Sequence, residues 1–222
     1  GILQLFAATG INKGKTIATL VNYAIHPEIL GTARKLISPD LCGPLYDRIE
    51  SETGGIALFM NSAQGGMVTA DNRRENGNEA NDREECIRIG SLLADEALRI
   101  IGPATVDENP DIYCAYKTIQ FPVESEEMSF VLKNSPVAGK MAHNDDFSVI
   151  STRLNLLNIG KAQILTIPGE ALPNIGFYVK RHMKTSQPFL FGLTNDAFGY
   201  ILTKEDFNSF ERYKYITRTS LG

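Results

Sequence analysis

The sequence predicts a single α/β domain in which helices flank a mixed β-sheet, and three observations support this fold class. Apolar runs of strand length alternate with amphipathic helical patterns, as is typical of α/β proteins. Two pairs of strand-like runs, residues 2–7 with 16–25 and residues 148–157 with 161–167, are separated by short turns, which indicates antiparallel hairpins. The length of 222 residues suits one domain with a large core, spanning residues 1–222.

Capping residues mark where the first helices begin and end. Residues 38–40 (Ser-Pro-Asp) combine an N-cap residue, a proline and an acid, so a helix is expected to start there and to end at residues 54–55 (Gly-Gly). Residues 56–60 form a buried strand, and Asp82 begins a long amphipathic helix that Gly102 ends. The later elements are expected as strands at 112–121, 162–167 and 189–193, helices at 171–183 and 204–215, and an aperiodic segment with a solvated acidic cluster at 124–147.

Composition excludes several classes of function. The net charge of −4, without a basic block, argues against nucleic acid as a partner. No apolar run reaches the ~18 residues that span a bilayer, so no transmembrane segment is expected. Cys42, Cys86 and Cys114 are widely spaced and form no CxxC pair, which favours buried free thiols. The chain starts within a strand-like run and without Met, so we expect the domain to be truncated at its N-terminus.

Two strand ends in the C-terminal half place polar residues where α/β proteins bind ligands. Glu170 follows the apolar run 162–167, and Asn195 and Tyr200 follow the run 189–193. The carboxyl ends of parallel strands meet at one edge of a sheet, so a carboxylate and a phenol are expected on the same rim. Two interpretations stay open, since Glu170 also suits a helix cap and Tyr200 suits half-buried packing.

An earlier strand end carries a histidine, and a buried strand opens into a glycine loop. Pro27 ends pairing of residues 16–25 and holds His26 extended, and a neutral imidazole is a common zinc ligand. A lone histidine is also often structural. The loop that contains Gly65 and Gly66 is either a tight packing turn or a backbone wall around a site.

Four segments, taken in chain order, resemble the catalytic domain of the neutral/alkaline non-lysosomal ceramidases. Residues 22–27 (Asn-Tyr-Ala-Ile-His-Pro) resemble the family's Asn-aromatic-x-x-His-Pro segment, and residues 62–69 resemble its glycine loop. Residues 168–170 resemble its Pro-Gly-Glu turn, whereas residues 105–147 show no convincing match. The C-terminal signature is matched by residues 195–200, by 211–213 (Glu-Arg-Tyr) and by 219–222 (Thr-Ser-Leu-Gly).

The resemblance implies a zinc site, since that family holds one zinc ion with two His, a Glu and a Tyr. By this resemblance, His26 corresponds to the second histidine ligand of the family, Glu170 to the glutamate ligand and Tyr200 to the tyrosine ligand. Tyr213 falls on the family's catalytic Tyr, with one extra residue in the segment before it. The first His lies in an upstream His-x-His segment, which we expect outside this sequence. The substrate contacts expected beside these residues are Gly65, Gly66 and Asn195.

The function that the resemblance implies is zinc-dependent hydrolysis of an amide. Zinc would polarise the carbonyl and lower the pKa of water towards ~7, and Tyr213 would donate a hydrogen bond to the oxyanion. The expected partner is a small-molecule or lipid amide, with contact to a membrane surface, and an N-acyl lipid would yield a fatty acid and an amino alcohol. The resemblance also implies a secreted or periplasmic protein.

A degenerate, noncatalytic ceramidase-like domain that binds a glycan, a lipid or a partner is the alternative function. A serine esterase is disfavoured because the chain has no G-x-S-x-G motif.

Overall fold

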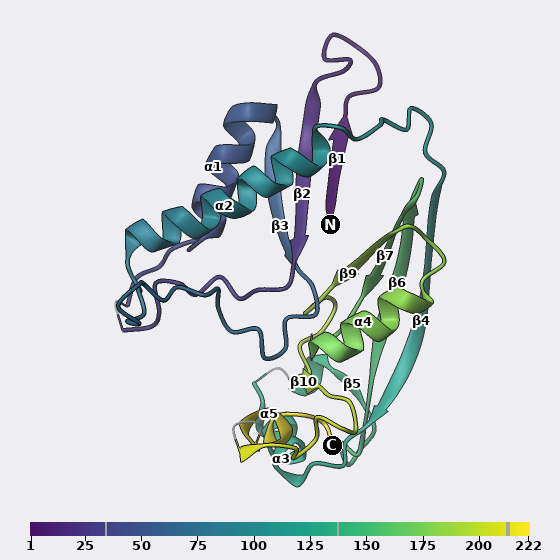
Figure 1. Ribbon diagram of the computed structural model, residues 1–222. Helices are drawn as coiled ribbons and strands as arrows, with labels where there is room; N and C mark the ends of the chain where they lie inside the picture. The colour runs from purple at the N-terminus through teal and green to yellow at the C-terminus, as the bar shows by residue number, and fades with distance from the viewer. Residues whose placement is uncertain (34, 137, 212–213) are drawn as a thin grey trace. The chain divides into compact units, whose positions relative to one another are not determined.

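The structure is a computed structural model that describes residues 1–222 except 34, 137, 212 and 213. The described chain divides into two compact units. The first comprises residues 1–61 and 67–109, and the second comprises residues 62–66 and 110–222. Each unit contains its own β-sheet and helices (Figure 1).

The first unit is built on a three-stranded mixed sheet in the order β1-β2-β3. β1 (Ile2–Phe6) runs antiparallel to β2 (Thr16–Tyr23), which confirms the first predicted hairpin, and β2 runs parallel to β3 (Ile56–Asn61). The parallel pair is joined through α1 (Cys42–Thr53). Strands and crossover helix therefore form a β-α-β arrangement with one antiparallel edge strand.

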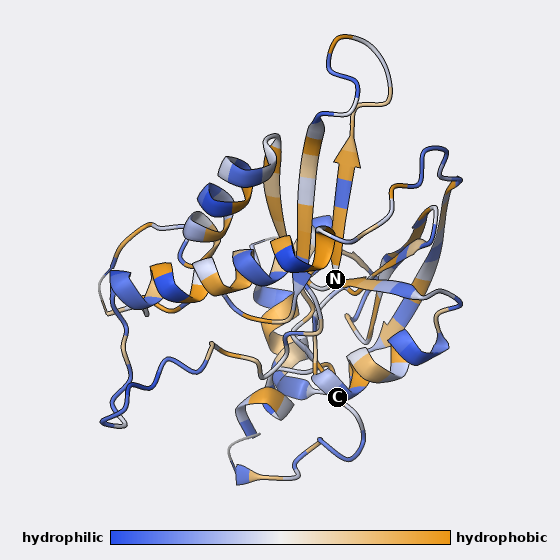
Figure 2. Cartoon of the chain, turned by 45° about the horizontal axis from the view of Figure 1, so that its top comes forward, coloured by the Kyte–Doolittle hydropathy of each residue, from blue (hydrophilic) through white to orange (hydrophobic). Residues whose placement is uncertain are grey.

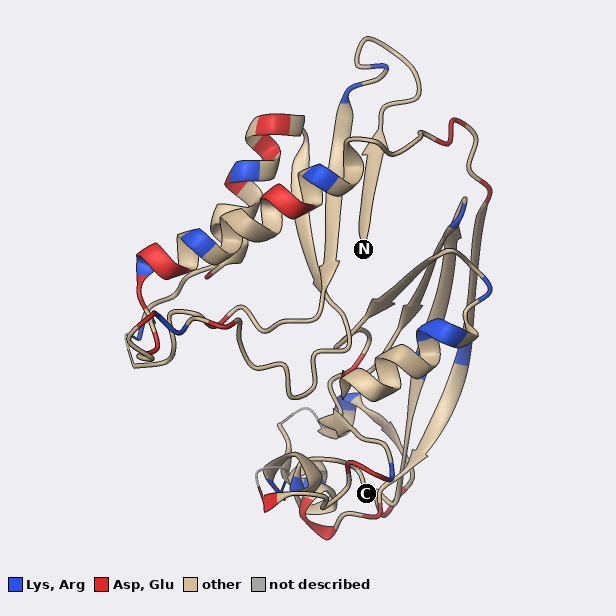
Figure 3. Ribbon diagram, viewed as in Figure 1, with Lys and Arg blue, Asp and Glu red and all other residues tan. Residues whose placement is uncertain are grey.

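Two helices bury the core of the first unit. α2 (Arg83–Ile101) packs against α1, and the cluster between helices and sheet is apolar, with members Val21, Leu45, Ile49, Ala57, Ala94 and Ala97. Figure 2 shows that α2 alternates between hydrophobic and hydrophilic residues, as an amphipathic surface helix does. Charged residues occur along both α1 and α2 (Figure 3). Asp82 caps α2 by accepting a hydrogen bond from Glu85 N at 2.9 Å, as the sequence predicts.

The helix expected from residues 38–40 begins later than predicted. α1 starts at Cys42, because Asp40 has a left-handed backbone with φ of 53°. The buried Asp40 carboxylate accepts hydrogen bonds from the amides of Ile29 (2.9 Å), Leu30 (2.8 Å) and Leu41 (2.7 Å). Asp40 thus fastens the preceding loop to the helix start.

The second unit is built on a five-stranded sheet whose main path runs β4-β6-β7-β9. β4 (Ile112–Pro122), β6 (Val149–Ile159) and β7 (Ala162–Thr166) are antiparallel neighbours, which confirms the second predicted hairpin. β9 (Gln187–Phe191) is parallel to β7 and is reached through α4 (Pro173–His182). The short β5 (Ala142–His143) pairs with β6.

Smaller elements complete the second unit beyond the C-terminal ends of β7 and β9. β8 (Glu170–Ala171) and β10 (Tyr200–Ile201) form a two-stranded parallel sheet. A helix is present where no periodicity was expected, since α3 covers Glu126–Asn134 and its Ser125 side chain accepts a hydrogen bond from Met128 N. A single 3₁₀ turn, η1, covers Ala138–Lys140.

Three further details differ from the sequence predictions. Glu170 lies in β8, and α4 begins after it at Pro173, so Glu170 does not occupy the first turn of that helix. Of the helix predicted at residues 204–215, residues 204–208 form a turn and α5 (Lys214–Arg218) begins later, because tertiary hydrogen bonds such as Asn208 N to Thr217 Oγ1 (3.1 Å) compete with helical ones. Cys114 is exposed because β4 is the edge strand of its sheet, whereas Cys42 and Cys86 are buried; all three thiols are free.

The predicted α/β class with mixed sheets and flanking helices is confirmed. Among the described residues, no helix combines the length and the apolar character needed to cross a membrane.

Candidate functional site

Glu170 and Tyr200 occupy directly paired positions in neighbouring parallel strands of the second unit. Glu170 of β8 is in register with Tyr200 of β10, and the Glu170 amide donates a hydrogen bond to Gly199 O at 2.9 Å. Paired residues of a parallel ladder project from the same face of the sheet. The structure therefore brings together the carboxylate and the phenol that the sequence placed on one rim.

The surroundings of Tyr200 keep its phenol protonated. Burial raises the pKa of Tyr200 above its usual range, and the negative charge of Glu170 raises it further. A hydrogen bond and the charge of Tyr215 act in the same direction. A divalent cation at the two oxygens would reverse the sign of this effect, because it stabilises phenolate as well as carboxylate.

Tyr215 joins this pair and was not singled out from the sequence. It lies in α5, and its ring meets the ring of Tyr200 edge-on, with the centroids 5.8 Å apart. Its side chain is 64% exposed, so the phenol faces solvent as well as Tyr200. The only signal in the sequence is the density of tyrosines at residues 213–215, and helical spacing alone does not select between them.

The glycine loop lies against the backbone of Glu170. Gly65 N donates a hydrogen bond to Ala171 O at 2.9 Å, and a Cβ on Gly65 would lie 2.4 Å from Glu170 O. Only glycine permits so close an approach of two backbones. Gly66 follows with a left-handed φ of 75° and is exposed. The loop thus packs tightly against the strand that carries Glu170, and its expected contact with a substrate stays a prediction.

Asn195 connects the segment before Tyr200 to the five-stranded sheet. Its Nδ2 lies 2.6 Å from Arg153 O, 3.0 Å from Asn155 Oδ1 and 3.2 Å from Thr166 Oγ1. Its φ of 76° is left-handed, a conformation that asparagine tolerates better than most residues. The next residue, Asp196, accepts a hydrogen bond from the buried Thr152 hydroxyl. The structure shows Asn195 holding this loop in place.

His26 lies in the first unit, and its ring is held by the backbone of Met67. Its Nδ1 is 2.8 Å from Met67 O, so Nδ1 carries the proton in the tautomer that makes this hydrogen bond. Its expected role as a zinc ligand stays a prediction.

The remaining predictions have different outcomes. Tyr213 lies outside the described residues, so its expected role stays a prediction. His143 is an exposed residue whose ring stacks on Phe147. In the part of the chain that the structure describes, no group of three His, Cys, Asp or Glu residues could hold a metal ion.

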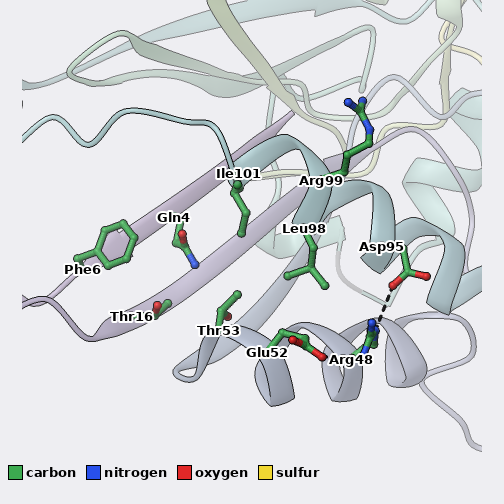
Figure 4. A pocket seen from close by; sticks show the side chains of 11 residues that line it. Gln4, Phe6, Thr16, Arg48, Glu52, Thr53, Asp95, Leu98, Arg99 and Ile101 are labelled. Carbon is green, nitrogen blue, oxygen red and sulfur yellow. Dashed lines mark hydrogen bonds and ion pairs between the residues drawn. The ribbon is translucent and has the colours of Figure 1, made fainter.

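Neither Glu170 nor Tyr200 lines either of two hollows in the described chain. One lies in the first unit, has a volume of about 650 Å³ and is lined by residues of β1, β2, α1 and α2 (Figure 4). Its charged groups are paired, since Arg48 binds both Glu52 (2.7 Å) and Asp95 (3.1 Å) and Arg99 binds Glu96 (2.6 Å). The other lies in the second unit between α3 and α5, with a volume of about 580 Å³.

Comparison of the fold with solved structures identifies a ceramidase-like fold. The chain superimposes on a crystal structure of neutral ceramidase from Pseudomonas aeruginosa with a TM-score of 0.72, 15% sequence identity and 98% of this chain covered. It matches a structure described as a ceramidase complexed with C2 with a TM-score of 0.70, 14% identity and 99% coverage. No protein-family model and no curated protein sequence matches the chain.

The likeness concerns the fold and part of the neighbours' length. The chain spans 42% and 44% of the two ceramidase chains. Their activity is therefore a hypothesis for this protein.

Proposed function

We propose that this protein is a zinc-dependent amide hydrolase that cleaves an N-acyl lipid into a fatty acid and an amino alcohol. The observation that supports the proposal is the pairing of Glu170 with Tyr200 on adjacent parallel strands of a ceramidase-like fold. These are two of the ligand positions that the resemblance implies. His26 lies in the other unit, and its part as a third ligand remains a prediction from that resemblance.

The donor set suits zinc. A carboxylate and a phenol oxygen are oxygen donors suited to zinc, and a catalytic zinc site keeps a position for water beside its protein ligands. When bound, zinc supplies a Lewis acid that polarises an amide carbonyl and acidifies water. A cation at this pair would offset the effect of the Glu170 charge, which raises the pKa of Tyr200.

The residues of the chain would then orient the reaction. The backbone of the Gly65 turn holds the strand that carries Glu170, and Asn195 fastens the loop that leads to Tyr200. Tyr215 places a second phenol ring beside the ring of Tyr200. Hydrogen-bond donors fixed in this way stabilise charge that develops on an amide oxygen.

Release of fatty acid from an N-acyl sphingosine tests the proposal. The wild type should release fatty acid, a chelator should stop the reaction and added zinc should restore it. Glu170→Gln should lower the rate by about a hundredfold or more, since the loss of a metal ligand has at least the 10–100-fold effect known for supporting residues.

Glu205→Gln is the matched control, because Glu205 is an exposed glutamate of the same unit. Glu205 is not part of the Glu170–Tyr200 pair. If the wild type and Glu170→Gln behave alike, the hydrolase proposal is wrong. Saturable lipid binding without hydrolysis would point instead to the noncatalytic ceramidase-like binding domain.

A further inference from the structure

The groove between α3 and α5 has an apolar floor and a charged rim. Met128, Phe130, Val131 and Tyr215 supply apolar surface, and Phe130 and Tyr215 are 69% and 64% exposed. On the rim, Arg218 pairs with Glu127 at 3.0 Å. The volume of about 580 Å³ lies within the ~300–1,000 Å³ of small-molecule sites.

Glu170 and Tyr200 do not line this groove, but three contacts connect its lining to the segment that carries Tyr200. The Tyr215 ring forms one wall of the groove and also meets the Tyr200 ring edge-on. Thr219, at the end of the groove, accepts a hydrogen bond from Tyr200 N at 3.2 Å through its carbonyl. The Met128 methyl group lies 3.7 Å from the position of a Cβ on Gly199, the residue before Tyr200. The groove therefore lies beside Tyr200, and a ligand in it would contact the same Tyr215 ring that meets Tyr200.

We infer that the α3–α5 groove binds the acyl chain of the substrate, with the scissile amide at Glu170 and Tyr200. This inference rests on the proposed function and adds the position of the aliphatic chain. The chemistry of the groove suits an unbranched alkyl chain, because its floor offers aromatic and thioether surface and the base that lines it, Arg218, is already paired with Glu127. α3 belongs to the segment in which the sequence shows no resemblance to the ceramidases.

Chain length is the property that such a groove selects. Each methylene buried in an apolar site contributes about a fourfold gain in affinity, until the chain exceeds the groove. Affinity for a fatty acid should therefore rise steeply from butanoate through octanoate to dodecanoate. Truncating one aromatic wall should lower the affinity for dodecanoate by about tenfold and flatten this dependence.

Binding of fatty acids by calorimetry tests the inference without any turnover. The probes are butanoate, octanoate and dodecanoate, all below their micelle concentrations. The test variant is Phe130→Ser in α3. Phe177→Ser in α4 is the matched control, since Phe177 belongs to the same unit, is 64% exposed and does not line the groove. Thermal unfolding of both variants verifies that each is folded.

The expected result is a chain-length dependence in the wild type and in Phe177→Ser that Phe130→Ser loses. Equal affinities of the two variants, or no binding of dodecanoate by the wild type, would overturn the inference. A dimer that only Phe130→Ser dissociates would also overturn it, because a second copy would then occupy the groove. The hydrolase proposal is judged separately, by release of fatty acid and by Glu170→Gln.

Discussion

Replacing Gly65 by alanine would put a methyl group against the backbone of Glu170. The added Cβ would lie 2.4 Å from Glu170 O and 2.9 Å from the carbonyl carbon of Ala171, whereas real Cβ contacts are not shorter than 3.0 Å. The neighbours are backbone atoms of a paired strand, so they cannot rotate away. The strand must shift by several tenths of an ångström, and the hydrogen bond from Gly65 N to Ala171 O must lengthen.

The expected cost follows from overpacking of a well-packed site, which lowers the free energy of unfolding by about 1–3 kcal/mol. For a chain of this length each kcal/mol lowers the melting temperature by about 2–4 °C. Circular dichroism during heating measures the shift. Gly139→Ala is the control, because a Cβ on Gly139 meets nothing within 4 Å. If the two variants melt together, the close approach of the loop to Glu170 is not real.

Other predictions follow from the same site and from the core. Asn195→Ala should destabilise by about 1–2 kcal/mol in urea titrations, and Asn195→Gly by less, because glycine keeps the left-handed backbone while losing the amide contacts; equal losses would contradict the role of the backbone. Because the pKa of Tyr200 is raised in the folded state, its contribution to the free energy of unfolding is complete below about pH 10 and is lost as the pH rises further. Tyr200→Phe should therefore lose less stability than the wild type at alkaline pH. Parallel curves of the free energy of unfolding against pH would contradict this expectation. Burial raises the pKa of Cys42 and of Cys86 to about 11. A disulfide reagent at neutral pH should therefore modify Cys114 rapidly and the two buried thiols only after denaturation. Rapid modification of all three thiols would contradict the burial of Cys42 and Cys86.

Local signals in the sequence predicted much of the fold. The Asp82 cap, both hairpins and the parallel strand reached through α4 depend on residues that are near each other in the chain. The rim with Glu170 and Tyr200 followed from the rule that parallel strands end at one edge. These features need no knowledge of distant contacts.

Features that depend on distant contacts were missed. The start of α3 has a recognisable capping signal, because Ser125 precedes two glutamates. The helix is short, however, and only Met128 and Leu132 are buried, so its apolar periodicity is weak. Leu132 packs against Ile150 and Phe198, which are far away in the sequence. The start of α1 shifted because Asp40 binds amides ten and eleven residues earlier.

Tyr215 was missed for the same reason. Its importance lies in the ring contact with Tyr200 and in the groove with α3, and both depend on where α5 packs. The residues that link a candidate site to its surroundings were therefore harder to predict than the residues of the paired strands.

Zinc content is the measurement that tests the central claim most directly. The protein, dialysed against trace zinc and analysed by mass spectrometry, should retain about one equivalent of zinc, as should Glu205→Gln. Glu170→Gln and Tyr200→Phe should each lose most of it, because each removes one oxygen ligand of the pair. Equal zinc in all four proteins, or negligible zinc in the wild type, would contradict the claim that Glu170 and Tyr200 bind a metal ion.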